Sequence, residues 1–195
     1  MFLTGLEIRH EVESGRLRVA PFRIARLKAA SYVLSLGTRF RRWRRTNSPI
    51  VLWSAGAGSQ HLEEPFEDRT VIVPPGEFLL GSTAEVIGVP DDRMGMISPL
   101  SHVARFGLGV TGGATLVNPG FGMTAPSQLT LELFNANSSP LQLTAGMPIA
   151  HLRIALLNTD GATVAMRPSI YEGADPVVEP KLFEEWSKLQ DGDSA

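Results

Sequence analysis

The chain contains no cysteine among its 195 residues. Disulfide bonds, thiol nucleophiles and cysteine-ligated zinc sites are therefore excluded. No apolar run approaches the roughly 18 residues of a membrane span, and charges interrupt the N-terminus where a signal peptide would be apolar. The net charge is only −2, so there is no global basic field to attract nucleic acid. We expect a soluble, cytoplasmic protein that does not bind nucleic acid or membranes.

Several common catalytic motifs are missing as well. The sequence has no GxxxxGK[ST] or GxSxG, which excludes a P-loop and a hydrolase nucleophile elbow. The histidines form no HxH or HxxxH pair; they are His10, His61, His102 and His151. We therefore expect no protein-bound metal.

Turn-forming residues are plentiful, with 19 glycines and 14 prolines. From residue 71 onward short apolar segments recur between turns, a pattern typical of an all-β sandwich or barrel. Residues 54–70 are polar and glycine-rich and predict a loop. The strands make one core, so we predict a single domain over 1–195, with no boundary inside 20–165.

Both ends of the chain predict short helices. Thr4 and Glu7 have capping-box spacing and Gly15 is a natural helix stop, which predicts a helix over 5–14 within the N-terminal region 1–19. The C-terminal tail, 166–195, carries apolar residues at helical spacing in KLFEEWSKLQ. This second helix should be amphipathic and pack on the body or on a neighbouring subunit.

An arginine-rich run follows a predicted strand. Tyr32, Leu34 and Leu36 alternate with smaller residues, and five arginines then surround Phe40 and Trp43 between positions 39 and 45. Such a run could bind nucleic acid. Because the net charge is slightly negative, we favour an edge strand that charge keeps soluble.

Glu132 is the residue whose setting is most unusual, since it lies within the apolar segment LTLELFN. Alternation places it on the face opposite Leu131 and Leu133. Spacing alone favours a side chain that faces solvent on a one-sided sheet. If Glu132 were instead buried, its pKa would rise and it could serve as a general acid or base.

Several segments together resemble the dCTP deaminase branch of the dUTPase superfamily. SPLSHVARFGL is similar to the family's GRSSLARLGL, LVNPGF to IDPGF, LTLELFN to VLEFYN, and AASYVLSLGTRF to PxSYDLRLG. LQLTAGMPIAHL is similar to its Pro-Gly-Met turn, and the motifs keep their order from about residue 1 to 157.

The resemblance implies a distorted jelly-roll fold and a homotrimer with active sites between subunits. It implies zinc-free deamination in which Glu132 is the general base, Ser101 hydrogen-bonds in the catalytic centre and Arg105 supports it electrostatically. The substrate-binding positions that it implies are Thr111, Ala114, Asn118 and His102. No resident cofactor is implied, although Mg²⁺ could accompany a phosphorylated substrate.

The departures from the family pattern concentrate at its phosphate end. Leu100 replaces an arginine and His102 replaces a serine, both associated in the family with triphosphate binding. Val33 and Asn118 each replace an aspartate of the family. The segment between Asn118 and Glu132 is about four residues longer than in the family. The substrate of such a deaminase would then carry fewer phosphates.

Two other functions stay open at this stage. One is a catalytically inactive trimer that binds a nucleotide or a protein. The other is a dUTP pyrophosphatase, which is weakened because the family's aspartate is Asn118 here and an amide is a poor general base. The leading hypothesis is deamination of a deoxycytidine nucleotide.

Overall fold

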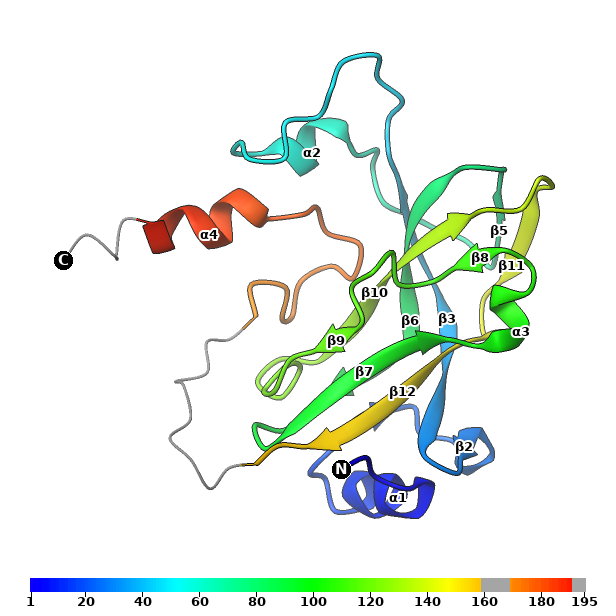
Figure 1. Cartoon of the computed structure of the whole chain (residues 1–195), viewed down its shortest axis with the longest axis vertical. Coiled ribbons are helices and arrows are strands. Elements are labelled where there is room, and N and C mark those ends of the chain that lie inside the picture. Colours follow the sequence, from blue (N-terminus) through cyan, green and yellow to red (C-terminus); the bar gives the residue numbers. More distant parts are fainter. Residues whose placement is uncertain (159–168, 191–195) are drawn as a thin grey trace.

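The computed structural model describes residues 1–158 and 169–190. Strands dominate it, and short helices lie near both ends (Figure 1). The strands are β1 (Arg18–Ala20), β2 (Leu27–Lys28), β3 (Ser31–Arg42), β4 (Phe66–Glu67), β5 (Thr70–Val73), β6 (Phe78–Gly88), β7 (Arg93–Pro99), β8 (Leu108–Gly109), β9 (Leu116–Val117), β10 (Ser127–Asn135), β11 (Leu141–Thr144) and β12 (Pro148–Leu156). The helices are α1 (Gly5–Glu13), the 3₁₀ helix η1 (Ile24–Arg26), α2 (Ala57–His61), α3 (Ser101–Ala104) and α4 (Leu182–Gln190).

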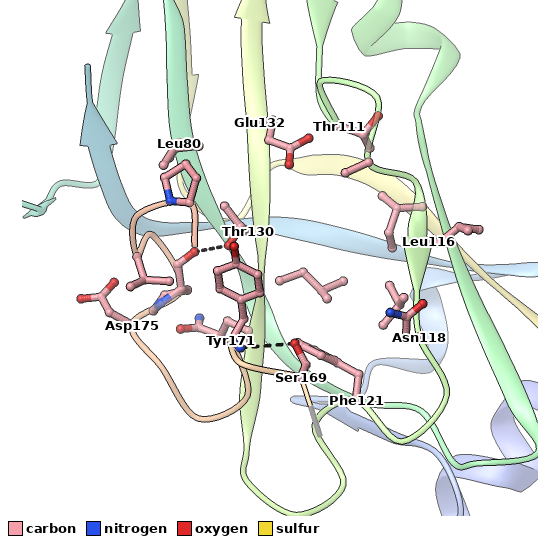
Figure 2. A pocket seen from close by; sticks show the side chains of 18 of the residues that line it. Leu80, Thr111, Leu116, Asn118, Phe121, Thr130, Glu132, Ser169, Tyr171 and Asp175 are labelled. Carbon is pink, nitrogen blue, oxygen red and sulfur yellow. Dashed lines mark hydrogen bonds between the residues drawn. The ribbon is translucent and has the colours of Figure 1, made fainter. Parts of the chain in front are cut away.

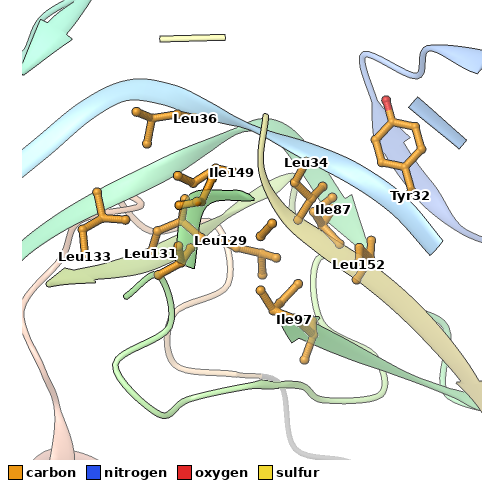
Figure 3. Packing of buried hydrophobic residues seen from close by; sticks show 14 of the residues in the cluster. Tyr32, Leu34, Leu36, Ile87, Ile97, Leu129, Leu131, Leu133, Ile149 and Leu152 are labelled. Atoms are coloured by element: carbon orange, nitrogen blue, oxygen red, sulfur yellow. The ribbon is translucent and has the colours of Figure 1, made fainter. Parts of the chain in front are cut away.

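The main sheet is antiparallel and runs in the order β8-β10-β6-β3-β12-β7-β9. It curls so that leucines and isoleucines from its strands share one core (Figure 3). On β10 the alternation is clear, because Leu129, Leu131 and Leu133 are buried while Thr130 and Phe134 on the other face are exposed. Burying each such leucine stabilises the fold by about 1.5–3 kcal/mol. The predicted all-β fold is confirmed.

The predicted terminal helices are also confirmed. In α1 the Glu7 amide donates to Thr4 Oγ1 and the Thr4 amide donates to Glu7 Oε2, which is the reciprocal capping box. Gly15 follows with a φ of 77°, a left-handed conformation that glycine adopts readily. The tail helix is α4; residues 166–168 and 191–195 of the predicted tail lie outside the described residues. No helix within 1–158 and 169–190 has the length and apolarity to cross a membrane.

The prediction that the arginine run forms an edge strand is wrong. Residues 39–42 of the run are the end of β3, which pairs with β4 on one side and β6 on the other, and residues 43–45 follow the strand. Arg39 and Arg41 instead bind carboxylates of the tail, as described below. Residues 54–70 are also not a simple loop, because they contain α2 and β4.

A buried carboxylate joins β3 to β6 at the centre of the sheet. Glu85 on β6 is 2% exposed and accepts hydrogen bonds from the Ser35 amide at 2.8 Å and from Ser35 Oγ at 2.6 Å. The β3–β6 register shifts between Leu36 and Phe40. Glu85 thus satisfies a backbone donor beside an irregular stretch of the ladder.

We predict that Glu85→Ala lowers the free energy of unfolding by about 2–4 kcal/mol, because it leaves two buried donors of Ser35 unpaired. Urea denaturation followed by circular dichroism would measure this. Glu64→Ala is the matched control, because Glu64 is exposed and should tolerate the change. Equal unfolding midpoints for the two variants would contradict the role assigned to Glu85.

Candidate active site

A cavity of about 350 Å³ lies on the outer face of β10. Glu132 and Thr130 project into it from the strand, the segment 111–121 forms a second wall, and residues 169–180 of the tail form a third (Figure 2). Its charged lining residues are all carboxylates: Glu132, Asp175 and Glu179. The cavity therefore suits a neutral ring better than an anion.

Glu132 lies directly against the backbone of the segment 111–114. Thr111 forms an isolated backbone bridge with Glu132. At Gly112, where φ is +51°, an added Cβ would come within 2.8 Å of Glu132 Cβ and 2.9 Å of Oε2. Only glycine allows this approach. The neighbouring Gly113 also has a positive φ but faces open space.

The environment of Glu132 changes its acidity. Burial raises the pKa of the Glu132 carboxyl above its usual 4.5, and a hydrogen bond from the Ala114 backbone partly opposes that rise. Glu132 is on the outward face of β10, as predicted, but the interpretation that it faces open solvent is wrong, because the cavity encloses it in part. A half-buried carboxylate of raised pKa is suited to proton transfer.

The tail is held over the cavity by polar contacts and one buried side chain. Thr130 Oγ1 donates to the Pro176 carbonyl at 2.5 Å, and the Gly173 amide donates to Ser127 Oγ at 2.9 Å. Val177 is fully buried in a small cluster with Leu62 and Leu80.

The arginine run and the extra residues before β10, both noted in the sequence, also contact the tail. Arg39 Nη2 lies 2.6 Å from Asp175 Oδ2, and Arg41 Nη1 lies 3.3 Å from Glu179 Oε2. In the longer loop before β10, the amides at 124 and 125 both donate to Glu172 Oε1. The arginine run and the extra loop residues therefore both position the third wall of the cavity.

The predicted site residues separate into two groups within one chain. Thr111, Ala114 and Asn118 line the same cavity as Glu132. Ser101 and His102, in contrast, line another pocket at α3. Arg105, which ends α3, is exposed and lines neither of these cavities.

Sequence reasoning did not find every residue that forms this cavity. Gly112 was missed, although the paired glycines in TGGAT were an available indication. Asp175 and Pro176 were missed because nothing local marks a tail residue as the wall of a distant cavity. Tyr171 of the tail also lines the cavity.

Comparisons with known proteins agree with this arrangement of strands. A family model described as dCTP deaminase-like matches residues 2–157. A protein named dCTP deaminase, dUMP-forming, from Streptomyces avermitilis is 35% identical over 153 residues, 78% of each chain. One of the same name from Rhodococcus opacus is 33% identical over 160 residues, 82% of each chain.

The fold also matches a solved structure. The dCTP deaminase of Agrobacterium tumefaciens superposes with a TM-score of 0.61 at 16% identity. The match covers 80% of this chain and 48% of that one, which supports the dUTPase-like jelly roll as the fold. The family model ends before the tail that closes the cavity. From its strands and from the similarity of residues 2–157, the chain belongs to the dCTP deaminase-like family.

Proposed function

We propose that the chain is a hydrolase that removes the amino group from a deoxycytidine nucleotide. The observation that carries this proposal is Glu132, a half-buried carboxylate of raised pKa in the wall of the cavity. No lysine, arginine or histidine lines that cavity, so it suits the uncharged base of a nucleotide better than its phosphates. The names of relatives at 33–35% identity support the same chemistry. The chain would act in the cytoplasm, as the sequence predicts.

Glu132 would transfer the protons of the reaction. As the carboxylate, it accepts a proton from water while the water oxygen adds to the ring carbon that bears the amine. The proton then moves to the departing nitrogen, so that water and the cytosine nucleotide become ammonia and the uracil nucleotide. The Ala114 backbone, already hydrogen-bonded to Glu132, helps to orient that carboxylate.

Ser101 and Arg105 would reach this chemistry from a neighbouring subunit of a homotrimer. Neither residue lines the Glu132 cavity of its own chain, and Arg105 is exposed and forms no ion pair with the described residues. A guanidinium placed there would stabilise developing negative charge, and a serine hydroxyl can orient water.

The phosphates of the substrate would stay attached. Forming dUMP from dCTP also requires release of pyrophosphate, and the resemblance assigns that step to an aspartate where this chain has Asn118. Residues 1–158 and 169–190 hold no group of three His, Asp or Glu that could bind a metal. Mg²⁺ would therefore arrive with the phosphates of the substrate rather than as a resident ion.

We predict that the purified protein releases ammonia from at least one of dCMP, dCDP and dCTP, with the phosphate count unchanged in the product. Glu132→Gln should lower kcat about 10²- to 10⁴-fold, because glutamine cannot accept the proton, while the melting temperature is retained. An ammonia-release assay measures kcat, chromatography of the products gives their phosphate count, and a thermal-shift assay gives the melting temperature. If no cytosine nucleotide is deaminated, the inactive binding protein becomes the better hypothesis, and pyrophosphate release from dUTP would favour the pyrophosphatase.

The close approach at Gly112 offers a finer test of the role of Glu132. Gly112→Ala should lower kcat about a hundredfold, because a displacement of about 1 Å at a reacting group has an effect of that size. Gly113→Ala also places a side chain at a positive φ, here +122°, without touching Glu132, so it is the control for backbone strain. Equal losses in both variants would show that the segment, and not the position of Glu132, limits the rate.

Mixed trimers test the sharing of sites. Arg105→Ala and Glu132→Gln should each be inactive alone. If each site takes these residues from different subunits, unfolding and refolding an equal mixture should restore about one quarter of the wild-type activity by random assembly. An inactive mixture that still contains trimers by light scattering would place both residues in the same subunit's site.

A further inference from the structure

The loop 118–125, between β9 and β10, forms part of the second wall of the Glu132 cavity. Asn118 and Phe121 line the cavity from this loop. Residues 118–125 form neither helix nor strand, and they include part of the stretch in which this chain is longer than the family. The position of this wall must therefore be set by contacts with other segments of the chain.

Arg18 of β1 holds the middle of this loop. Its Nη1 donates to the Gly122 carbonyl at 2.5 Å, and its guanidinium forms no ion pair with a residue of 1–158 or 169–190. Gly122 lies against β6 with a φ of 70°, and an added Cβ there would collide with the Ile87 carbonyl oxygen. The loop therefore rests directly on the sheet at the residue that Arg18 binds.

Glu172 of the tail holds the end of the same loop. Its Oε1 accepts hydrogen bonds from the Thr124 amide at 2.9 Å, from Thr124 Oγ1 at 2.8 Å and from the Ala125 amide at 3.1 Å. Loss of water around the carboxyl would raise the pKa of Glu172, but hydrogen bonds from Ala125, Thr124 and Gly122 outweigh that effect and lower this pKa below its usual 4.5. Glu172 is therefore a carboxylate at neutral pH, and its hydrogen bonds to the loop are charge-assisted.

The backbone joins these two contacts to the residues that line the cavity. The Val89 amide, just after β6, donates to the Phe121 carbonyl at 2.8 Å, and the Gly120 amide donates to the Val89 carbonyl at 2.8 Å. Phe121 thus lies between this pair of backbone hydrogen bonds and the residue that Arg18 binds. A shift of the loop at 122–125 would therefore also move Phe121.

We propose that Arg18 and Glu172 are positioning residues that clamp the loop 118–125, and with it the wall against which the ring of the substrate binds. Neither residue lines the cavity, so each acts through Asn118 and Phe121. The proposal rests on the proposed function, because it takes this cavity as the place of the reaction. The clamp joins opposite ends of the chain, since Arg18 belongs to β1 and Glu172 to the tail.

Steady-state kinetics test the clamp. Arg18→Gln and Glu172→Ala should each raise the KM of the deaminated nucleotide about tenfold or more, the effect expected when a charge-assisted hydrogen bond is lost. The kcat should change little, because neither variant touches Glu132. Glu172→Gln retains an oxygen acceptor and should restore most of the wild-type KM. Arg23→Gln and Glu185→Ala, at exposed positions of the same two segments, are the matched controls. A lower kcat at an unchanged KM, or a wild-type KM in both variants, would overturn the proposal.

Hydrogen exchange of the full chain without substrate, read for single amides by mass spectrometry, tests the clamp apart from catalysis. In Glu172→Ala the amides of Gly120 and Phe121 should exchange about tenfold faster, although Glu172 is not their acceptor. Faster exchange confined to Thr124 and Ala125 would show a local contact only, which would overturn the clamp and leave the deaminase proposal standing. Faster exchange across the loop, in a protein that deaminates no nucleotide, would instead support the clamp and reject the proposed reaction.

Discussion

The partial removal of the Glu132 carboxylate from water is the constraint on which the rest of the site depends. Removing a carboxylate from water is costly, and the raised pKa of Glu132 is a consequence of that cost. Three separate parts of the chain remove this carboxylate from water. They are the outward face of β10, Gly112, which lets the segment 111–114 approach Glu132, and the tail that covers the cavity. None of these alone would enclose the side chain, so the acidity of Glu132 is a tertiary property.

The arginines at the end of β3 help to hold the tail that covers Glu132. A cationic strand inside a sheet is unfavourable unless its charges are neutralised. For Arg39 and Arg41 the neutralising carboxylates are Asp175 and Glu179, more than 130 positions away in sequence, whereas Arg42 pairs with Glu77, the residue before β6. These ion pairs neutralise the charges of Arg39 and Arg41 and also position the tail. The arginines can therefore lie on an interior strand without nucleic acid as their partner. Exposed ion pairs stabilise little by themselves, so the hydrogen bonds at Ser127 and Thr130 and the burial of Val177 contribute to the docking.

What the sequence could predict follows from the range of the interactions involved. The capping box of α1, the alternation in β10 and the turn-rich all-β character depend on neighbours within a few residues, and all were predictable. The preserved order of several motifs also allowed the family, and Glu132 as the candidate general base, to be predicted. The edge-strand prediction for Arg39 and Arg41 was wrong because the charges were read without their distant partners. The wall formed by Asp175 and Pro176 depends on contacts between segments that no local pattern connects.

A cytosine nucleotide makes opposite demands on a protein at its two ends. Water activation at the ring needs a carboxylate, whereas the phosphates need cations; two like charges about 4 Å apart repel by about 4 kcal/mol at a typical protein dielectric. This chain places three carboxylates and no cation in the lining of the Glu132 cavity. Under the proposed function, the phosphates of the nucleotide therefore extend beyond the Glu132 cavity, because the lining of that cavity offers them no cation.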